Sequence, residues 1–188
     1  MSIGVRKRFY SVSGCAFLDA LCKLKKVAVM SKLGMREHTC CFTGHRPEKL
    51  IISEQAVISQ LEAAIQNAIR EGYTTFISGM AKGVDIWGAE LVLQHPQVRL
   101  VCAVPFRGFG MRWEGDWTER FCRIIQKADE VVYICPGYST DVFQTRNIWM
   151  VDHSSLVIAA YNGTPGGTRN TIMYAQSQAD CEIRYLPL

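Results

Sequence analysis

The sequence predicts a Rossmann-like α/β fold, a three-layer sandwich in which a mostly parallel sheet of about six strands is flanked by helices. Two observations support this prediction. From residue 38 onward, short apolar runs alternate with longer segments of helical periodicity, which is the pattern of a parallel sheet covered by helices. The run at residues 98–104 is almost wholly apolar, as a strand buried on both faces requires.

The first strand is expected at residues 38–43, and it leads through a turn into a helix at about residues 53–71. Apolar residues recur in this helix with the period of an α-helix. They are Ala56, Leu61, Ala64, Ile65 and Ala68. Gly72 ends the helix, because glycine readily adopts the left-handed conformation that follows a helix terminus.

The same alternation continues to the end of the sequence. Further strands are expected at residues 74–78, 98–104, 130–135, 156–161 and 182–186. Further helices are expected at residues 83–94, 113–127, 143–153 and 167–179. Pro96 follows the first of these helices and stops it, because proline lacks the backbone N–H that a helix needs.

The charge of the chain is unevenly distributed. Of its 188 residues, 48% are hydrophobic and 20% are charged, which suits one globular domain with a sizeable core. The formal net charge is +4, yet residues 1–34 contain seven Lys or Arg and one Asp, whereas residues 35–188 contain fourteen basic and sixteen acidic residues. We therefore predict a basic, poorly ordered extension at residues 1–34 and the α/β domain at residues 35–188. Whether the extension belongs to the native protein stays open.

Composition also limits the partners. Nucleic acid is an unexpected partner, because the mildly acidic domain offers no clustered basic surface. No apolar run approaches the roughly 20 residues of a membrane span, so no membrane is expected. Cys41, Cys102 and Cys135 lie within apolar runs, and the sequence contains no Cys-x-x-Cys pair. We therefore expect no metal site and a cytoplasmic location.

A glycine-punctuated turn follows the second expected strand. It reads Ser78-Gly79-Met80-Ala81-Lys82-Gly83-Val84-Asp85 and runs directly into a helix. Glycine lets the backbone approach a ligand closely, and the amide groups at a helix start attract phosphate. The turn matches neither G-x-G-x-x-G nor the Walker pattern, and a purely structural role for its glycines stays open.

A second glycine-rich loop follows the fifth expected strand and again opens a helix. It includes Gly163, Gly166, Gly167 and Thr168. The backbone amides and the Thr168 hydroxyl suit an anion, although Thr168 could equally serve as a helix N-cap. Because ligands of open α/β sheets bind at the carboxyl ends of the strands, we predict that the two loops together form an anion site.

Other strand ends add candidates to the same edge of the sheet. Gly44, His45 and Arg46 follow the first strand, and Pro105 follows the third. Arg146 and Asn147 lie in the helix after the fourth strand. We expect Arg46, Lys82 and Arg146 to add positive charge for phosphate.

Two carboxylates are candidates for acid/base chemistry, and no Ser-His-Asp or Cys-His arrangement accompanies them. Asp85 lies in the first turn of its helix, where the dipole stabilises a carboxylate whatever its function. Its functional alternatives are a hydrogen bond to a ribose or the activation of a water molecule. Glu90 lies five residues later, off the same helix face, so the two form no evident acid/base pair.

Four ordered motifs resemble the YpsA-like family of bacterial proteins, which belongs to the SLOG superfamily and has no known function. They are Thr43-Gly44-His45-Arg46-Pro47, the turn at residues 78–85 with Trp87 and Glu90, the segment from Arg146 to Asp152, and Gly166-Gly167-Thr168. The resemblance spans about residue 38 to the end. It implies a Rossmann-like fold and a pocket for a nucleotide or a derivative such as NAD or ADP-ribose.

The superfamily also includes the LOG nucleotide hydrolases and the DprA DNA-processing proteins, and both relationships suggest alternatives. LOG enzymes resemble this chain in the paired glycines, but they carry acidic residues afterwards, whereas Arg169-Asn170-Thr171-Ile172 contains no Glu. A LOG-like phosphoribohydrolase and a DprA-like single-stranded DNA-binding module therefore remain as alternatives to our first expectation.

That first expectation is a cytoplasmic protein that binds or senses a nucleotide-derived ligand. NAD, ADP-ribose and nucleoside phosphates are the candidate ligands, and the sequence does not identify a cofactor. Whether the protein is an enzyme stays open, with Asp85 and Glu90 as the candidate catalytic residues. The oligomeric state also stays open, with a homo-oligomer as one option.

Overall fold

The computed structural model describes residues 36–187, and the expected N-terminal extension lies outside these residues. In the described range, six strands form one sheet. They are β1 (Thr39–Gly44), β2 (Thr75–Ser78), β3 (Arg99–Val104), β4 (Glu130–Tyr133), β5 (Leu156–Ala160) and β6 (Glu182–Tyr185). Every neighbouring pair is parallel. The predicted Rossmann-like α/β fold is confirmed.

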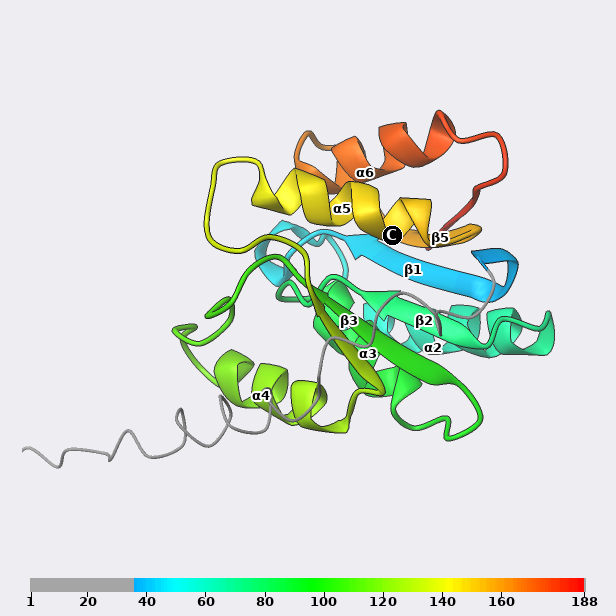
Figure 1. Ribbon diagram of the computed structural model, residues 1–188. Coiled ribbons are helices and arrows are strands. Elements are labelled where there is room, and N and C mark those ends of the chain that lie inside the picture. Colours follow the sequence, from blue (N-terminus) through cyan, green and yellow to red (C-terminus); the bar gives the residue numbers. More distant parts are fainter. Residues whose placement is uncertain (1–35, 188) are drawn as a thin grey trace, which may run out of the picture. The chain divides into compact units, whose positions relative to one another are not determined.

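The helices of the described range alternate with these strands (Figure 1). They are α2 (Glu54–Arg70), α3 (Val84–Val92), α4 (Trp117–Lys127), α5 (Val142–Asp152) and α6 (Gly167–Gln176). Two short 3-10 turns, Arg36–His38 and Pro47–Lys49, flank β1. Ser53 caps α2, because its hydroxyl accepts a hydrogen bond from the Ala56 amide at 3.2 Å.

The strand order places a topological switch point beside β1. The order across the sheet is β4-β3-β2-β1-β5-β6. The chain moves outward from β1 to β4 and then returns through α5 to β5, on the other side of β1. In such sheets the loops that leave the two strands at the switch point diverge, and they leave a crevice at the carboxyl ends.

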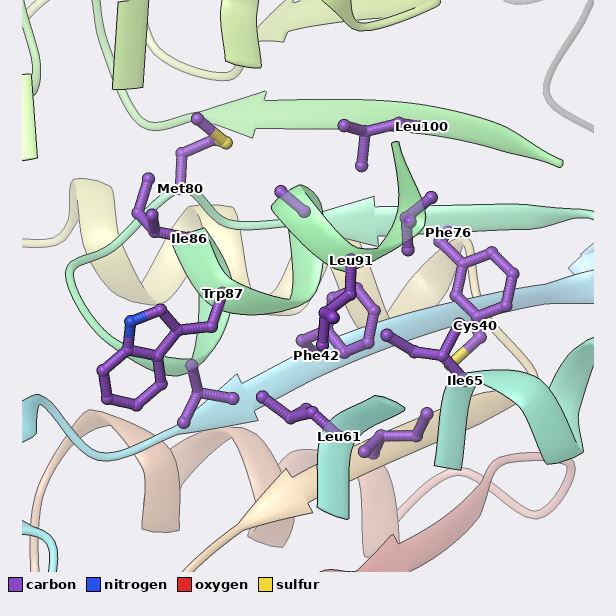
Figure 2. Packing of buried hydrophobic residues seen from close by; sticks show 14 of the residues in the cluster. Cys40, Phe42, Leu61, Ile65, Phe76, Met80, Ile86, Trp87, Leu91 and Leu100 are labelled. Atoms are coloured by element: carbon purple, nitrogen blue, oxygen red, sulfur yellow. The ribbon is translucent and has the colours of Figure 1, made fainter. Parts of the chain in front are cut away.

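The two faces of the sheet have separate cores. Cys40 and Phe42 of β1 pack with residues of α2, α3 and α4, and Figure 2 shows labelled side chains of this cluster. Cys41, between them in sequence, packs in a second cluster with Met150 of α5 and Ile172 of α6. This alternation follows from the two-residue period of a strand, and it explains why every residue of β5 is buried.

The helix α4 begins at Trp117, four residues later than the sequence periodicity predicts. The preceding residues form a turn, in which Gly115 has a φ of +67°. The Thr118 hydroxyl holds this turn, since it donates to the Gly110 carbonyl at 2.8 Å and accepts from the Trp113 amide at 3.0 Å. These two hydrogen bonds tie the Thr118 side chain to the turn that precedes α4.

Across residues 36–187, no helix is both long enough and apolar enough to cross a membrane.

Candidate functional site

A cavity of about 440 Å³ opens at the carboxyl ends of β1 and β5, at the switch point. Nine residues that the sequence singled out line it. They are Gly44, His45, Arg46, Asp85, Arg146, Asn147, Gly166, Gly167 and Thr168. These residues come from four segments of the chain, namely the end of β1 with the loop that follows it, the first turn of α3, the second turn of α5 and the start of α6.

The loops after β1 and β5 are joined to each other. The His45 amide donates to the Ala160 carbonyl at 3.2 Å, which extends the pairing of β1 and β5 by one residue. The Asn162 side chain donates to the Lys49 carbonyl at 2.7 Å. These contacts hold the 3-10 turn at Pro47–Lys49 against the cavity, with the exposed side chains of Arg46 and Lys49 at its rim.

His45 is buried between these two loops. Its ring lies 5.4 Å from the Tyr161 ring, and its Nε2 atom lies 3.4 Å from the Thr164 hydroxyl. Burial lowers the pKa of His45 below its ordinary value of 6.5, and the nearby Lys49 ammonium lowers it further, against a hydrogen bond with Asn162 that raises it. His45 is therefore a neutral imidazole at pH 7.

The loop after β2 is held by hydrogen bonds within itself. The Ser78 hydroxyl donates to the Asp85 carbonyl at 2.8 Å and accepts from the Met80 amide at 3.1 Å. The Ala81 amide donates to Asp85 Oδ2 at 3.2 Å. Met80 has a φ of +60°, and its side chain is fully buried in the core. Internal bonding and packing thus fix the backbone of this loop.

Asp85 and Arg146 form a buried ion pair in the wall of the cavity. Asp85 Oδ2 lies 3.7 Å from Arg146 Nη1, and the two side chains are only 10% and 6% exposed. Arg146 Nη1 also donates to the Gly79 carbonyl. Burial raises the pKa of the Asp85 carboxyl, while the Arg146 charge and the Ala81 amide act in the opposite direction.

The ion pair is incompletely hydrogen-bonded. Asp85 Oδ1 and Arg146 Nε are both shielded from water, and neither has a hydrogen-bond partner among the described residues. A buried carboxylate oxygen or guanidinium N–H without a partner costs free energy, so an additional hydrogen-bond partner for these atoms would be stabilising.

The start of α6 forms another part of the cavity wall. Gly166 is the N-cap residue, and no side chain caps this helix within the described range. Its φ of +150° and ψ of −169° are open to glycine and disfavoured for other residues. Gly167 and Thr168 follow as the first helical residues, so their backbone N–H groups have no partner within the helix. An anion is the natural partner of such a helix start.

Eight further residues line the cavity, namely Phe42, Thr43, Glu48, Lys49, Ala81, Phe109, Phe143 and Met150. The sequence did not single out Phe109 or Phe143. Phe109 follows β3, Phe143 lies in the first turn of α5, and their rings are 5.8 Å apart. The ring centroids of Phe109 and Phe106 are 5.7 Å apart, and those of Phe106 and Tyr138 are 5.6 Å apart. The signal in the sequence was the frequency of aromatic residues in the segments after β3 and β4.

Seven other predicted binding residues do not line the cavity. They are Ser78, Gly79, Met80, Lys82, Gly83, Pro105 and Gly163. Of residues 78–83, only Ala81 thus lines the cavity. Lys82 lies over the Trp113 ring, with 5.6 Å between Nζ and the ring centroid.

The two candidate catalytic residues lie in different environments. Asp85 lines the cavity. The Glu90 carboxylate instead accepts hydrogen bonds from Arg120 Nε at 3.0 Å, from Arg120 Nη2 at 2.5 Å and from Arg123 Nη2 at 3.3 Å. These bonds tie α3 to α4. Residues 36–187 contain no group of three or more His, Cys, Asp or Glu side chains arranged to hold a metal ion.

Comparison with known proteins identifies relatives of this chain. The YpsA family, described as the YspA SLOG family, matches residues 40–187. The uncharacterized SPbeta prophage-derived protein YoqJ of Bacillus subtilis (strain 168) is 31% identical over 134 residues, covering 62% of this chain and 78% of that protein. UPF0398 protein OB1025 of Oceanobacillus iheyensis is 25% identical over 142 residues, covering 68% of this chain and 76% of that protein.

Two solved structures share the fold. DNA processing protein A (DprA) from Streptococcus pneumoniae superposes with a TM-score of 0.61 at 19% identity, over 82% of this chain and 52% of that one. DNA processing protein A from Helicobacter pylori, described for its single-stranded DNA binding mode, superposes with a TM-score of 0.58 at 19% identity, over 83% of this chain and 67% of that one. This chain therefore spans about half of the pneumococcal protein, and the likeness establishes the fold alone.

Proposed function

This chain belongs to the YpsA family of SLOG proteins, and from the cavity at the switch point of its sheet we propose that it binds or senses a nucleotide-derived ligand that carries phosphate. Nucleoside phosphates, ADP-ribose and NAD are ligands of this class. The observation that carries the proposal is that an uncapped helix start and an aromatic pair line the same cavity. We propose a cytoplasmic location, in keeping with the buried thiols of Cys40 and Cys41.

The phosphate binds at the start of α6. There the amides of Gly167 and Thr168 are available as donors, and the helix dipole favours negative charge. Arg46 and Lys49 also line the cavity, and Lys49 Nζ lies 3.9 Å from the position that a Cβ on Gly166 would occupy. Two exposed cations and a set of backbone donors together neutralise a phosphate dianion.

The base binds at the opposite wall. Phe109 and Phe143 offer ring surface to the cavity, and Phe143 is 37% exposed. Stacking of a base on an aromatic side chain contributes about 1–3 kcal/mol and depends little on which base is bound. The volume of about 440 Å³ lies in the usual range of small-molecule sites and suits one nucleotide.

Titration calorimetry with AMP, ADP, ADP-ribose, NAD and adenosine tests this proposal. We expect the phosphorylated compounds to bind more tightly than adenosine. The Lys49→Ala variant should weaken AMP binding by roughly tenfold, since it loses one charge-assisted contact. Arg70→Ala is the matched control, because Arg70 is exposed on α2 and does not line the cavity. Equal AMP affinity of the unsubstituted protein and the Lys49→Ala variant would contradict the proposed phosphate site.

Single-stranded DNA is a second candidate, favoured by one specific observation. The Helicobacter pylori protein with the same fold is described as binding single-stranded DNA. This description weighs against our expectation, based on charge, that nucleic acid is an unlikely partner. The aromatic chain from Phe143 through Phe109 and Phe106 ends at Tyr138, which is 70% exposed, and the exposed Arg107 directly follows Phe106 in sequence. Exposed aromatics with cations are what single strands bind.

Fluorescence anisotropy with a labelled oligothymidylate separates the two candidates. A DNA-binding module should bind with a strong salt dependence and lose affinity in Tyr138→Ala. A nucleotide site should instead show calorimetric binding of AMP that oligothymidylate does not compete away. Chromatography of the AMP and NAD mixtures for free base then distinguishes a binding protein from a hydrolase.

A further inference from the structure

The two unpartnered atoms of the buried ion pair differ in hydrogen-bonding type. Asp85 Oδ1 is an acceptor, and Arg146 Nε carries a donor hydrogen. Both side chains line the cavity, and they are close together, since Asp85 Oδ2 is 3.7 Å from Arg146 Nη1. Both unpartnered atoms are shielded from water, so a group in the cavity reaches them only after the two side chains shift.

This combination selects the chemistry of the group that can bind there. A hydroxyl group both donates and accepts, so a single hydroxyl, or two adjacent ones, can satisfy Asp85 Oδ1 and Arg146 Nε together. A phosphate has only acceptors when ionised, and the Asp85 carboxylate would repel it. A methylene group satisfies neither atom and would leave both unpaired beneath it, which costs free energy.

The position of Asp85 and Arg146 along the sheet agrees with a hydroxyl group as their partner. Across the edge of the sheet, the phosphate loops follow β5 and β1, Asp85 lies on the helix after β2, and the aromatic residues follow β3 and β4. Asp85 lies at the start of α3, beside Val84, which lies against Gly44 at the end of β1. The order phosphate, Asp85, aromatic ring matches the order phosphate, ribose, base in a nucleotide.

We propose that Asp85 and Arg146 bind the ribose hydroxyl groups of the ligand, so that the cavity selects ribonucleotides over nucleotides that lack these hydroxyls. This proposal rests on the nucleotide-binding function proposed above and narrows its ligand class. Rotation about the Cβ–Cγ bond of Asp85, a torsion with a broad energy profile, brings a carboxylate oxygen to face the hydroxyl. The ligand then supplies the hydrogen bonds that the unliganded pair lacks.

Calorimetric titration of the intact protein with matched nucleotides tests the proposal. The probes are the 5′-monophosphates of adenosine, guanosine, cytidine and uridine, each compared with its 2′,3′-dideoxy counterpart. For every ribonucleotide that binds, we expect the dideoxy compound to bind roughly 10- to 100-fold more weakly, as the loss of hydrogen bonds to charged groups predicts. Affinities that agree within about twofold would overturn the hydroxyl proposal and leave the phosphate site standing.

Two variants extend this test. Asp85→Asn keeps the size of the side chain but replaces one acceptor by a donor, so it should reduce the ratio between ribo and dideoxy affinity to about threefold or less. Glu119→Gln is the matched control, because Glu119 is exposed on α4 and should keep the full ratio. Thermal unfolding establishes that each variant is folded. If Asp85→Asn does not fold, the ratio in the unsubstituted protein still decides.

The two proposals fail in different ways. If none of the four ribonucleotides binds, the proposed nucleotide site is wrong and the hydroxyl proposal falls with it. If ribonucleotides bind and Lys49→Ala weakens them, but removal of both hydroxyls has no effect, only the role of Asp85 and Arg146 is wrong.

Discussion

The two glycine-rich loops look alike in sequence and have different environments in the fold. The loop at residues 78–83 is largely buried, and a Cβ on its Gly79 would collide with the Arg146 guanidinium. The loop at residues 162–167 is largely exposed. A Cβ on its Gly163 would meet no described atom within 4 Å, and one on Gly167 would come no closer than 4.0 Å to the Asn147 amide.

This contrast separates two uses of glycine. In the first loop, the missing side chains let the backbone pack against Arg146 and the loop after β1, so the glycines serve the fold. In the second loop, they leave backbone amides open to the cavity, which suits the phosphate site that we propose. Substitutions in the first loop should therefore change stability, and substitutions in the second should change binding.

The largest effect on stability is expected for Arg146→Leu, because the Arg146 side chain holds the loop at residues 78–83 in place. The substitution breaks the hydrogen bond to the Gly79 carbonyl and leaves the buried Asp85 carboxylate without its cation. The free energy of unfolding should fall by about 3–5 kcal/mol in urea denaturation. Since the cost comes mainly from the uncompensated charge, the double variant Arg146→Leu with Asp85→Leu should recover much of it. A double variant no more stable than the single one would contradict this account.

Two glycines with the same φ allow the stability cost of crowding to be separated from the cost of backbone strain. Gly83 and Gly163 both have a φ of +88°, but a Cβ on Gly83 would lie 3.0 Å from the His45 carbonyl oxygen, whereas one on Gly163 would meet no described atom. Gly163→Ala should cost about 1 kcal/mol from backbone strain alone, and Gly83→Ala about 3 kcal/mol because crowding is added. Equal losses in thermal unfolding would show that strain, rather than packing, dominates at both positions.

A smaller effect should appear when pH is lowered, because His45 is buried between the loops after β1 and β5. Its pKa is lower in the folded protein than its ordinary value of 6.5, so the unfolded chain takes up the proton first as pH falls. The stabilisation is present above pH 6.5 and is lost progressively below it. The melting temperature between pH 8 and pH 5 should fall more steeply for the unsubstituted protein than for His45→Gln, and parallel curves would exclude this contribution.

The smallest effect on stability is expected for Gly167→Ala. Gly167 is the first residue of α6, and its Cβ would come no closer than 4.0 Å to the Asn147 amide, so the melting temperature should stay the same or rise slightly. AMP affinity should nevertheless fall by about tenfold, because a methyl group would stand in the proposed phosphate site. Unchanged affinity would move the ligand away from the start of α6 and weaken the contrast between the two loops.

Much of the fold could be predicted from the sequence. Each strand and helix end agrees with its predicted position to within a few residues, because local periodicity and the residues that end helices encode these elements. The exception, the start of α4, depends on the Thr118 hydroxyl bonding to a distant glycine carbonyl. The predicted resemblance to the YpsA-like family is confirmed by the match to residues 40–187.

The candidate site could be predicted only in part. Nine of the predicted binding residues line the cavity because they lie at the carboxyl ends of strands, which the strand positions alone indicate. The sequence could not show that Glu90 is engaged by Arg120, or that Phe109 and Phe143 meet. Those contacts join residues on different helices and loops, and no local pattern encodes them.

By itself, the sequence determined the class of fold, the positions of the strands and the edge of the sheet on which a ligand would bind, because these depend on periodicity and on glycine at strand ends. Only the tertiary structure decided which glycine loop is open and which is packed. It also decided that Asp85 and Arg146 meet in the cavity wall with one vacant acceptor and one vacant donor. Strand order brings those elements together, and strand order is a property of the whole sheet rather than of any segment.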